Sequence, residues 1–297
     1  MKLGAVFPFT DINDDPYAIR DFVQAVDDLG YDHIVVYDHV LGSNPASRPG
    51  FSMPFTHLSP FYDPLTLFAH MAAISRRLEF FSAVLILPQR QAALVAKQAA
   101  ICDVLAGGRI RLGVGSGWNE AEYEALGVDF ANRGAVMDEQ IDLMRALWSD
   151  NAISFRGRFH TVTDAGICPL PPNRNIPVWI GGTAPPAMRR AARTGDGWIP
   201  YAPAREAPAM MDGFRTVMEQ EGRSFDGFGM EAVVFTHPED RPDFGGRVST
   251  LDDAFHDIEV WRGEGVTHVS LHSMATGAKD VPGHVAFLEK LIGGLGG

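Results

Sequence analysis

The spacing of apolar residues alternates between two periods along the chain. Continuous or every-second apolar runs, such as HIVVY (33–37) and EFFSAVLIL (79–87), are typical of buried strands. Between these runs, apolar residues recur every three or four positions, as in Phe22, Val26 and Leu29, which indicates amphipathic helices. The pattern predicts strands at 3–8, 33–37, 79–87, 109–114, 178–180, 197–200, 230–235 and 268–272. It predicts helices around 22–29, 64–74, 92–105, 137–147, 187–193, 207–220, 252–264 and 284–291.

Eight strand–helix units within 297 residues predict one α/β fold, a (β/α)8 TIM barrel with small insertions. We expect a single domain over 1–297, since no composition shift or low-complexity tract marks a boundary. Two excursions are expected: a hairpin in ISFRGRFHTV (153–162), and the Pro-, Ser- and aromatic-rich loop 40–63. A loop of that length inside a compact domain is usually either functional or disordered.

Composition narrows the classes of partner. The net charge of -12 argues against nucleic acid and anionic membrane surfaces, which require basic patches, but not against a small anionic ligand. We expect no signal peptide, because no basic start is followed by a long apolar region, and no membrane span, because no apolar run is long enough to cross a bilayer. The two cysteines, Cys102 and Cys168, lack metal or redox spacing, and Cys102 lies in a helical apolar pattern typical of the core. We therefore expect a cytoplasmic protein.

The stretch RIRLGVGSGWNE (109–120) resembles a nucleotide-binding turn, yet Trp118 stands where the dinucleotide fingerprint needs its third glycine. In a TIM barrel the active site lies at the carboxyl ends of the strands. This rule selects the residues after each strand, including two glycine turns, Gly115–Ser116 and Gly181–Thr183, which each precede a helix. Backbone N–H groups at such turns suit a single phosphate.

Five segments in this order carry a specific resemblance: DHV (38–40), AVLILPQR (83–90), LAGGRIRLGVGSGW (105–118), E-x-x-x-LG (122–127) and IPVWIGGTAPPAMRRAARTGDGW (176–198). Together they resemble the bacterial luciferase-like monooxygenase superfamily, and most of all its deazaflavin (coenzyme F420) dependent oxidoreductases. The resemblance extends over the chain up to about residue 201 and is much less diagnostic beyond it.

The resemblance implies a set of cofactor-binding residues. Asp38 and His39 match a pair beside the cofactor ring, with His39 as the candidate catalytic residue. Ala83 and Val84 match a pair joined by a non-prolyl cis peptide that forms a bulge behind that ring. The remaining matches lie in the two glycine turns: Gly115, Ser116 and Asn119 after the fourth strand, and Gly181, Gly182 and Thr183 after the fifth.

Two departures limit the substrate class. Ser116 stands where the sugar-phosphate dehydrogenases of this superfamily carry a catalytic glutamate. Near Ser43, this chain also lacks the tryptophan that covers the cofactor ring in those enzymes. Oxidation of a sugar phosphate is therefore not expected. The resemblance implies hydride transfer from reduced coenzyme F420 to a small electrophile such as a conjugated C=C or an imine. The alternatives are a two-component monooxygenase that uses reduced FMN, and a non-catalytic flavin-binding barrel.

The family also implies a homodimer packed through HMAAISRR (70–77) and LVAKQAAICDVL (94–105), and a separate reductase that supplies reduced cofactor. A metal site is not expected, because His268 and His272 share a strand face without a third ligand. A glycosidase would pair Glu120 with Glu231, which the strand order places at the opposite end of the barrel. Arg90 could pair with a carboxylate or bind an anionic cofactor tail. Trp118 and Trp198 are interpreted as core residues.

Overall fold

The predicted barrel is present in the computed structural model, which describes residues 1–12, 15–48, 55–234 and 250–295. Eight strands close into one barrel in the order β1–β2–β3–β4–β7–β8–β9–β10, and β10 pairs with β1. Neighbouring strands are parallel throughout the barrel. Their bounds are β1 Lys2–Val6, β2 His33–Val36, β3 Glu79–Ile86, β4 Ile110–Gly115, β7 Val178–Gly181, β8 Gly197–Ile199, β9 Gly229–Val234 and β10 His268–Leu271. The last residue of the predicted seventh strand, Phe235, lies outside the described residues.

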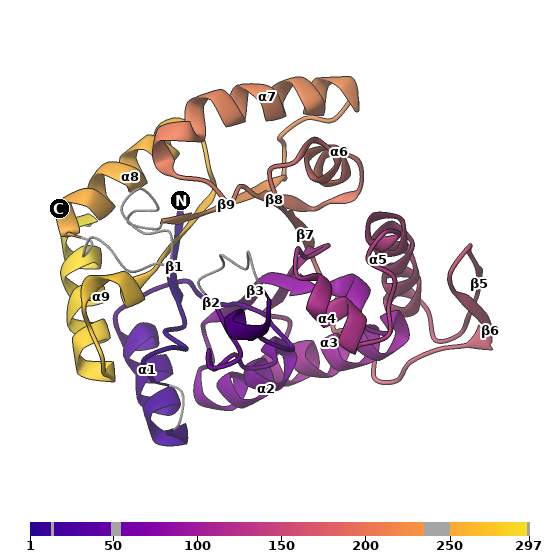
Figure 1. Ribbon diagram of the computed structural model, residues 1–297, viewed down its shortest axis with the longest axis horizontal. Coiled ribbons are helices and arrows are strands. Elements are labelled where there is room, and N and C mark those ends of the chain that lie inside the picture. Colours follow the sequence, from indigo (N-terminus) through magenta and orange to yellow (C-terminus); the bar gives the residue numbers. More distant parts are fainter. Residues whose placement is uncertain (13–14, 49–54, 235–249, 296–297) are drawn as a thin grey trace.

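Helices surround the barrel on its outside (Figure 1). Local sequence signals set their ends: Asp15 caps the first helix by accepting from the Tyr17 amide, and Gly107, in a left-handed conformation, ends the third. The bounds are α1 Pro16–Asp28, α2 Pro64–Ile74, α3 Ala92–Ala106, α4 Glu120–Ala125, α5 Arg133–Ser149, α6 Pro185–Thr194, α7 Ala207–Gln220, α8 Leu251–Gly263 and α9 Val281–Leu295. Short 3₁₀ turns are η1 Pro45–Ser47, η2 Leu87–Gln89, η3 Ala204–Glu206 and η4 Ser273–Thr276.

The predicted hairpin forms a separate two-stranded sheet outside the barrel, beside α5 (Figure 1). Its strands, β5 Ile153–Arg156 and β6 Thr161–Ala165, pair antiparallel. The carboxylate of Glu139 on α5 accepts hydrogen bonds from the backbone amides of residues 158–160 and from the His160 ring. One helix carboxylate therefore anchors the turn of the hairpin.

Strand β3 carries the irregularity that the resemblance predicts. The peptide bond between Ala83 and Val84 is cis, and the pairing of β3 with β4 shifts register between Ser82 and Leu85. The Val84 side chain fills the space where β4 and β7 would otherwise place side chains. A Cβ added at Gly115 would lie 2.5 Å from Val84 Cγ2, and one at Gly181 would lie 2.4 Å from Val84 Cγ1. Both glycines are therefore required by packing inside the barrel.

The amino-terminal end of the barrel interior is closed by a buried charged network, which we call the lower network: His33, Glu79, Arg111, Glu231, His268 and Ser270. Glu231 accepts from Arg111 at 2.8 Å and from His33 at 2.7 Å. The Arg111 guanidinium also lies over the rings of Phe81, at 3.7 Å, and Trp179, at 4.1 Å. At this end of the barrel, opposite charges and aromatic ring faces thus surround the buried charged groups in place of water.

Candidate active site

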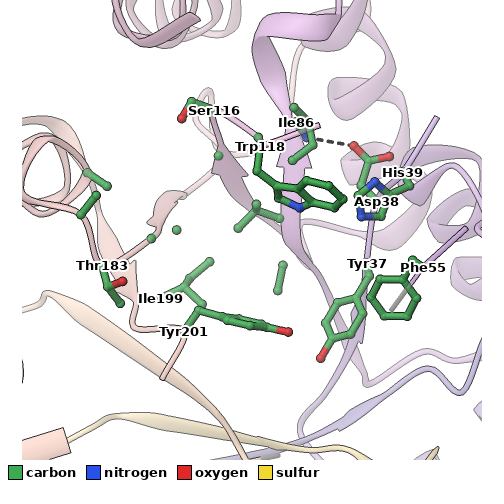
Figure 2. A pocket seen from close by; sticks show the side chains of 18 of the residues that line it. Tyr37, Asp38, His39, Phe55, Ile86, Ser116, Trp118, Thr183, Ile199 and Tyr201 are labelled. Carbon is green, nitrogen blue, oxygen red and sulfur yellow. Dashed lines mark hydrogen bonds between the residues drawn. The ribbon is translucent and has the colours of Figure 1, made fainter. Parts of the chain in front are cut away.

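A cavity of about 510 Å³ opens at the carboxyl ends of the strands (Figure 2). Nine of the ten predicted site residues line it, and Asn119 is the exception. Its lining comprises Tyr37, Asp38, His39, Phe55, Phe61, Ala83, Val84, Ile86, Gly115, Ser116, Gly117, Trp118, Gly181, Gly182, Thr183, Ala184, Ala187, Ile199 and Tyr201. The fold therefore brings segments that span more than 160 positions of sequence to one site, at the end where TIM barrels bind substrates.

Asp38 is a buried anchor at the end of β2. Its carboxylate accepts from both terminal nitrogens of Arg90, at 2.7 and 2.8 Å, and from the Ile86 amide at 2.8 Å. Burial raises the pKa of Asp38, and the Arg90 charge and the Ile86 hydrogen bond oppose that rise. Arg90 also pairs with Asp63 at 3.3 Å. The sequence left either a carboxylate or an anionic cofactor tail as the partner of Arg90, and the structure shows two carboxylates. The Asp38–Arg90 pair fixes the end of β2 against η2 and so holds the neighbouring His39 in place.

Glu122 of α4 is the residue behind His39. It is 1% exposed, and its Oε1 accepts from His39 Nδ1 at 3.1 Å and from the amides of Val40 and Leu41 at 2.9 and 3.1 Å. Its Oε2 accepts from Gln89 Nε2 at 3.1 Å. Burial alone would raise the pKa of Glu122, but these donors outweigh burial and hold the pKa below its usual value. Glu122 is thus an anionic acceptor at neutral pH.

An anionic acceptor at Nδ1 determines how His39 presents its ring. The hydrogen of the neutral imidazole is held on Nδ1, which leaves the Nε2 lone pair for the cavity that His39 lines. When the ring is protonated, Nε2 becomes a donor toward the cavity, while the Glu122 carboxylate at Nδ1 stabilises the positive charge. His39 can therefore accept or deliver a proton at Nε2. The E-x-x-x-LG motif contained the signal for Glu122, but its helical position alone did not show that it points toward β2.

The turn after β7 offers unused backbone donors. Gly182 has a φ of +115°, its amide donates to the Ile199 carbonyl, and its carbonyl accepts from Trp198 Nε1 at 2.8 Å. Among the described residues, the amides of Thr183 and Ala184 donate to no other group. The first two residues of α6 are prolines, which have no amide hydrogen. Two adjacent amides and the Thr183 hydroxyl therefore fit one phosphate group.

Hydrogen bonds to residues of α4 and to the segment after His39 hold the turn after β4. The Ser116 carbonyl accepts from the Tyr123 hydroxyl at 2.6 Å, and Gly117 has a φ of +66°. Asn119 caps α4 by accepting from the Ala121 amide at 3.3 Å, and its amide group donates to the Leu41 carbonyl at 3.4 Å. Asn119 therefore joins the β4 turn to the segment after His39 without lining the cavity, and its contact with a cofactor remains a prediction.

Five aromatic side chains outside the predicted set of site residues also line the cavity: Tyr37, Phe55, Phe61, Trp118 and Tyr201. The interpretation of Trp118 as a core residue was wrong, since it is 41% exposed and lines the cavity. Its position after β4 was a signal, because it stands in the loop that begins the site. Trp198 is a core residue as predicted, stacked on Phe214 at 4.0 Å.

The remaining candidates have structural partners. Glu231 is fully buried in the lower network, away from Glu120, as the strand order predicted for the glycosidase alternative. Cys102 is buried and donates to the Leu65 carbonyl, as expected of a core thiol. Within the described ranges, no group of three or more His, Cys, Asp or Glu side chains is placed to hold a metal ion. No helix in the described part of the chain is long and apolar enough to cross a membrane.

Comparison with known proteins agrees with this geometry. The sequence model of the luciferase-like monooxygenase family matches residues 1–243, and the chain belongs to this family. An uncharacterised protein of Mycobacterium tuberculosis (strain ATCC 25618 / H37Rv) is 38% identical over 182 residues, which is 59% of this chain and 62% of that protein. The pyrimidine monooxygenase RutA of Bradyrhizobium sp. (strain BTAi1 / ATCC BAA-1182) is 36% identical over 141 residues, 45% of this chain and 38% of that enzyme.

The chain thus matches less than two thirds of the length of these relatives. Among solved structures, the long-chain alkane monooxygenase LadA superposes with a TM-score of 0.78 at 14% identity, covering 100% of this chain and 91% of that one. An F420-dependent secondary alcohol dehydrogenase, in complex with an F420–acetone adduct, superposes with a TM-score of 0.76 at 15% identity, covering 98% and 97%. These likenesses show the luciferase-like (β/α)8 barrel, which F420-dependent and other oxidoreductases share.

Proposed function

We propose that this protein is an oxidoreductase that uses reduced coenzyme F420 for hydride transfer to a small electrophilic organic substrate. The observation that carries the proposal is the convergence of His39, the Val84 bulge and the free amides of Thr183 and Ala184 on one cavity. The bulge and the two glycine turns would hold the ring and the phosphate of the cofactor. The solved F420-dependent alcohol dehydrogenase of the same fold supports this choice of cofactor.

The residues of this chain would position the substrate and move the proton. Reduced coenzyme F420 supplies a hydride when it is bound, and a substrate C=C or C=N bond that accepts the hydride also needs a proton. His39 can deliver that proton from Nε2, because Glu122 stabilises the protonated ring through Nδ1. The surrounding aromatic side chains exclude water from the reacting atoms.

Reduced FMN is the second candidate, favoured by the sequence match to pyrimidine monooxygenase RutA. Reduced FMN reacts with dioxygen, so the same cavity would then support a monooxygenase. Both cofactors carry one phosphate at the end of the five-carbon chain attached to the ring, and the amides of Thr183 and Ala184 would serve either.

Titrating the purified protein with each cofactor separates the two. We expect coenzyme F420 to bind with micromolar affinity, as monitored by fluorescence quenching. We also expect turnover of reduced F420 with electrophilic substrates under anaerobic conditions. Micromolar binding of FMN with no response to coenzyme F420 would contradict the deazaflavin proposal. Binding without turnover of either reduced cofactor, across a panel of electrophiles with and without dioxygen, would instead favour a flavin-binding barrel without catalytic function.

We further propose that the protein acts in the cytoplasm as a homodimer served by a separate reductase. Helix α3 exposes four large apolar side chains, Leu94, Ile101, Val104 and Leu105, which is more apolar surface than a solvated helix needs. Packing of two copies through α2 and α3 would cover them. Light scattering at micromolar concentration should give twice the mass of one chain, and Leu94→Glu together with Leu105→Glu should shift it to the monomer mass. A monomer mass for the unaltered protein would contradict the dimer.

A further inference from the structure

The cavity has two chemically different sides (Figure 2). One side consists of the small residues and free amides of the β4 and β7 turns, with Ser116 and Thr183. The other side, here called the aromatic wall, consists of Phe55, Phe61, Trp118 and Tyr201, with His39 among them. If the cofactor occupies the glycine side, as the proposed function requires, the aromatic wall is left for the substrate.

Ring contacts hold the aromatic wall in place. His39 contacts Phe61 at a centroid distance of 4.7 Å and Trp118 at 5.5 Å, both edge to face. Phe55 contacts Phe61 at 4.9 Å, and both pack on Phe9. Because these edge-to-face contacts and the Glu122 hydrogen bond fix the ring of His39, the wall has a defined shape before a ligand arrives.

Trp118 differs from every other tryptophan of the chain. Trp148, Trp179, Trp198 and Trp261 are all at most 5% exposed, whereas Trp118 is 41% exposed within a concave site. Figure 2 shows its indole projecting from the β4 side across the cavity toward His39, with Tyr201 facing the same space. Exposing a large aromatic surface to water costs free energy, which a flat ligand stacked on the indole would recover.

The charges around the aromatic wall restrict the ligand further. Among the described residues that line the cavity, none is lysine or arginine, and Asp38 is neutralised by Arg90 behind it. An anionic substrate would lose its hydration at the aromatic wall without gaining an unpaired positive charge there, because the charge of a protonated His39 is already paired with Glu122. The polar groups of this wall are His39 Nε2, the Tyr201 hydroxyl and the Trp118 indole N–H, and of these His39 Nε2 can either accept from or donate to an uncharged edge.

We infer that the aromatic wall is the substrate subsite and that it takes flat, conjugated, uncharged molecules, which stack on Trp118. This inference rests on the proposed function only in assigning the glycine side to the cofactor. It applies to both candidate cofactors, because the aromatic wall is the same for each. It narrows the small electrophiles of the proposed function to planar ones such as aromatic lactones, lactams and enones.

The test is direct binding to the purified protein by isothermal titration calorimetry with three probes of similar size. Coumarin is flat and uncharged, octahydrocoumarin has the same skeleton but is not flat, and coumarin-3-carboxylate is flat but anionic. We expect coumarin to bind at least tenfold more tightly than either of the others, and to bind together with the cofactor. Equal binding of the three probes, no binding of coumarin at millimolar concentration, or competition between coumarin and the bound cofactor would overturn the inference.

Two variants locate the subsite. Trp118→Ala should weaken coumarin binding about tenfold, the loss expected for one stacked aromatic partner, and Trp118→Phe should restore part of it. Tyr17→Ala removes another exposed aromatic residue, on α1 outside the cavity, and should leave coumarin binding unchanged. Loss of cofactor binding in Trp118→Ala with coumarin binding intact would assign Trp118 to the cofactor and overturn the inference. Coumarin binding of the expected pattern without binding of either cofactor would refute the proposed function alone.

Discussion

The two ends of the barrel use polar side chains in opposite ways. At the amino-terminal end, Arg111, Glu231, His33 and Ser270 bond mainly to one another and are almost completely buried. At the carboxyl-terminal end, both carboxylate oxygens of the buried Glu122 also accept hydrogen bonds, but its partner His39 lines an open cavity. The same strands therefore carry a closed network at one end and an open site at the other.

This difference shows where stability and function divide within one sheet. A closed network of buried charges tolerates no loss of a partner, because the charge left behind cannot be solvated. An open site keeps groups such as His39 Nε2 available for a ligand, and it relies on residues behind them, Glu122 and Asp38, to hold their positions. Substitutions at the two ends should therefore affect different measurements.

The largest expected effect is on stability, at the closed end. Glu231→Gln keeps the shape of the side chain but removes the charge that faces Arg111 and His33, so unfolding free energy should fall by about 3 kcal/mol. Urea denaturation measures the loss, and cofactor affinity should remain unchanged under native conditions. Glu79→Gln is the matched control, since Glu79 also pairs with Arg111 but is partly exposed, and should cost about 1 kcal/mol. Equal losses of unfolding free energy in the two variants would show that burial of the carboxylate does not determine its contribution to stability.

The next effect is on turnover, at the open end. In Glu122→Gln the remaining carbonyl oxygen can still accept from His39, Val40 and Leu41, and the unpartnered Oε1 of Gln89 can accept from the new amide after a flip of the Gln89 side chain. The variant should therefore fold normally, but loss of the charge that supports protonated His39 should lower kcat/KM about 10- to 100-fold.

Nitrogen-15 NMR of the imidazole tests the same contact without turnover. The neutral ring of the unaltered protein should carry its hydrogen on Nδ1, as the Glu122 contact requires. In kinetics, His39→Ala combined with Glu122→Gln should be no slower than His39→Ala alone, because Glu122 acts through His39. Multiplicative losses in the double variant, or a hydrogen on Nε2, would disprove this positioning role.

A smaller effect is expected where the bulge meets the cavity. Gly181→Ala would place a Cβ 2.4 Å from Val84 Cγ1, so Val84 must shift into the space assigned to the cofactor. Calorimetry should show about tenfold weaker cofactor binding, the equivalent of a modest steric cost. Gly293→Ala is the control, because a Cβ at that position on α9 meets no atom within 4 Å, and cofactor affinity should not change. Unchanged affinity in Gly181→Ala would place the cofactor elsewhere.

The smallest effect concerns acid stability at the closed end. Burial, followed by the Arg111 charge, lowers the pKa of His268 from 6.5 to about 3, so the folded protein holds this ring neutral. Below pH 6.5 the unfolded chain binds a proton at His268 and the folded protein does not. The free energy of unfolding therefore falls progressively as the pH falls from 6.5 toward 3. His268→Gln should remove about 1 kcal/mol of the stability difference between pH 7 and pH 5.5 in urea denaturation. An unaltered pH slope in the variant would show that His268 is not responsible.

The barrel itself was predictable because its information is local. Strand runs such as HIVVY and the amphipathic spacing of Phe22 and Val26 occur within a few residues. Strand β2 lies within one residue of its predicted bounds, and α1 ends one residue before its predicted end, although it begins six residues earlier than predicted. Cap residues and glycines set the helix ends. The eight units then left a closed parallel barrel as the consistent arrangement.

The site was predictable in part, through position and resemblance. Residues such as Asp38, His39 and Gly182 follow strands, and the barrel rule together with the family motifs was enough to select them. The core interpretation of Trp118 failed because burial depends on what the remainder of the fold places above a residue. Composition and spacing carry no information on that.

The sequence by itself determined the succession of strands and helices, the end of the barrel that carries the site, and most residues of its glycine side. Each of these follows from periodicity, turn chemistry or a motif within one segment. Only the tertiary structure decided that Glu122 holds His39, that Arg90 is occupied by Asp38, and that Gly115 and Gly181 make room for Val84. These contacts join residues 31 to 97 positions apart, and their geometry exists only once the barrel has closed.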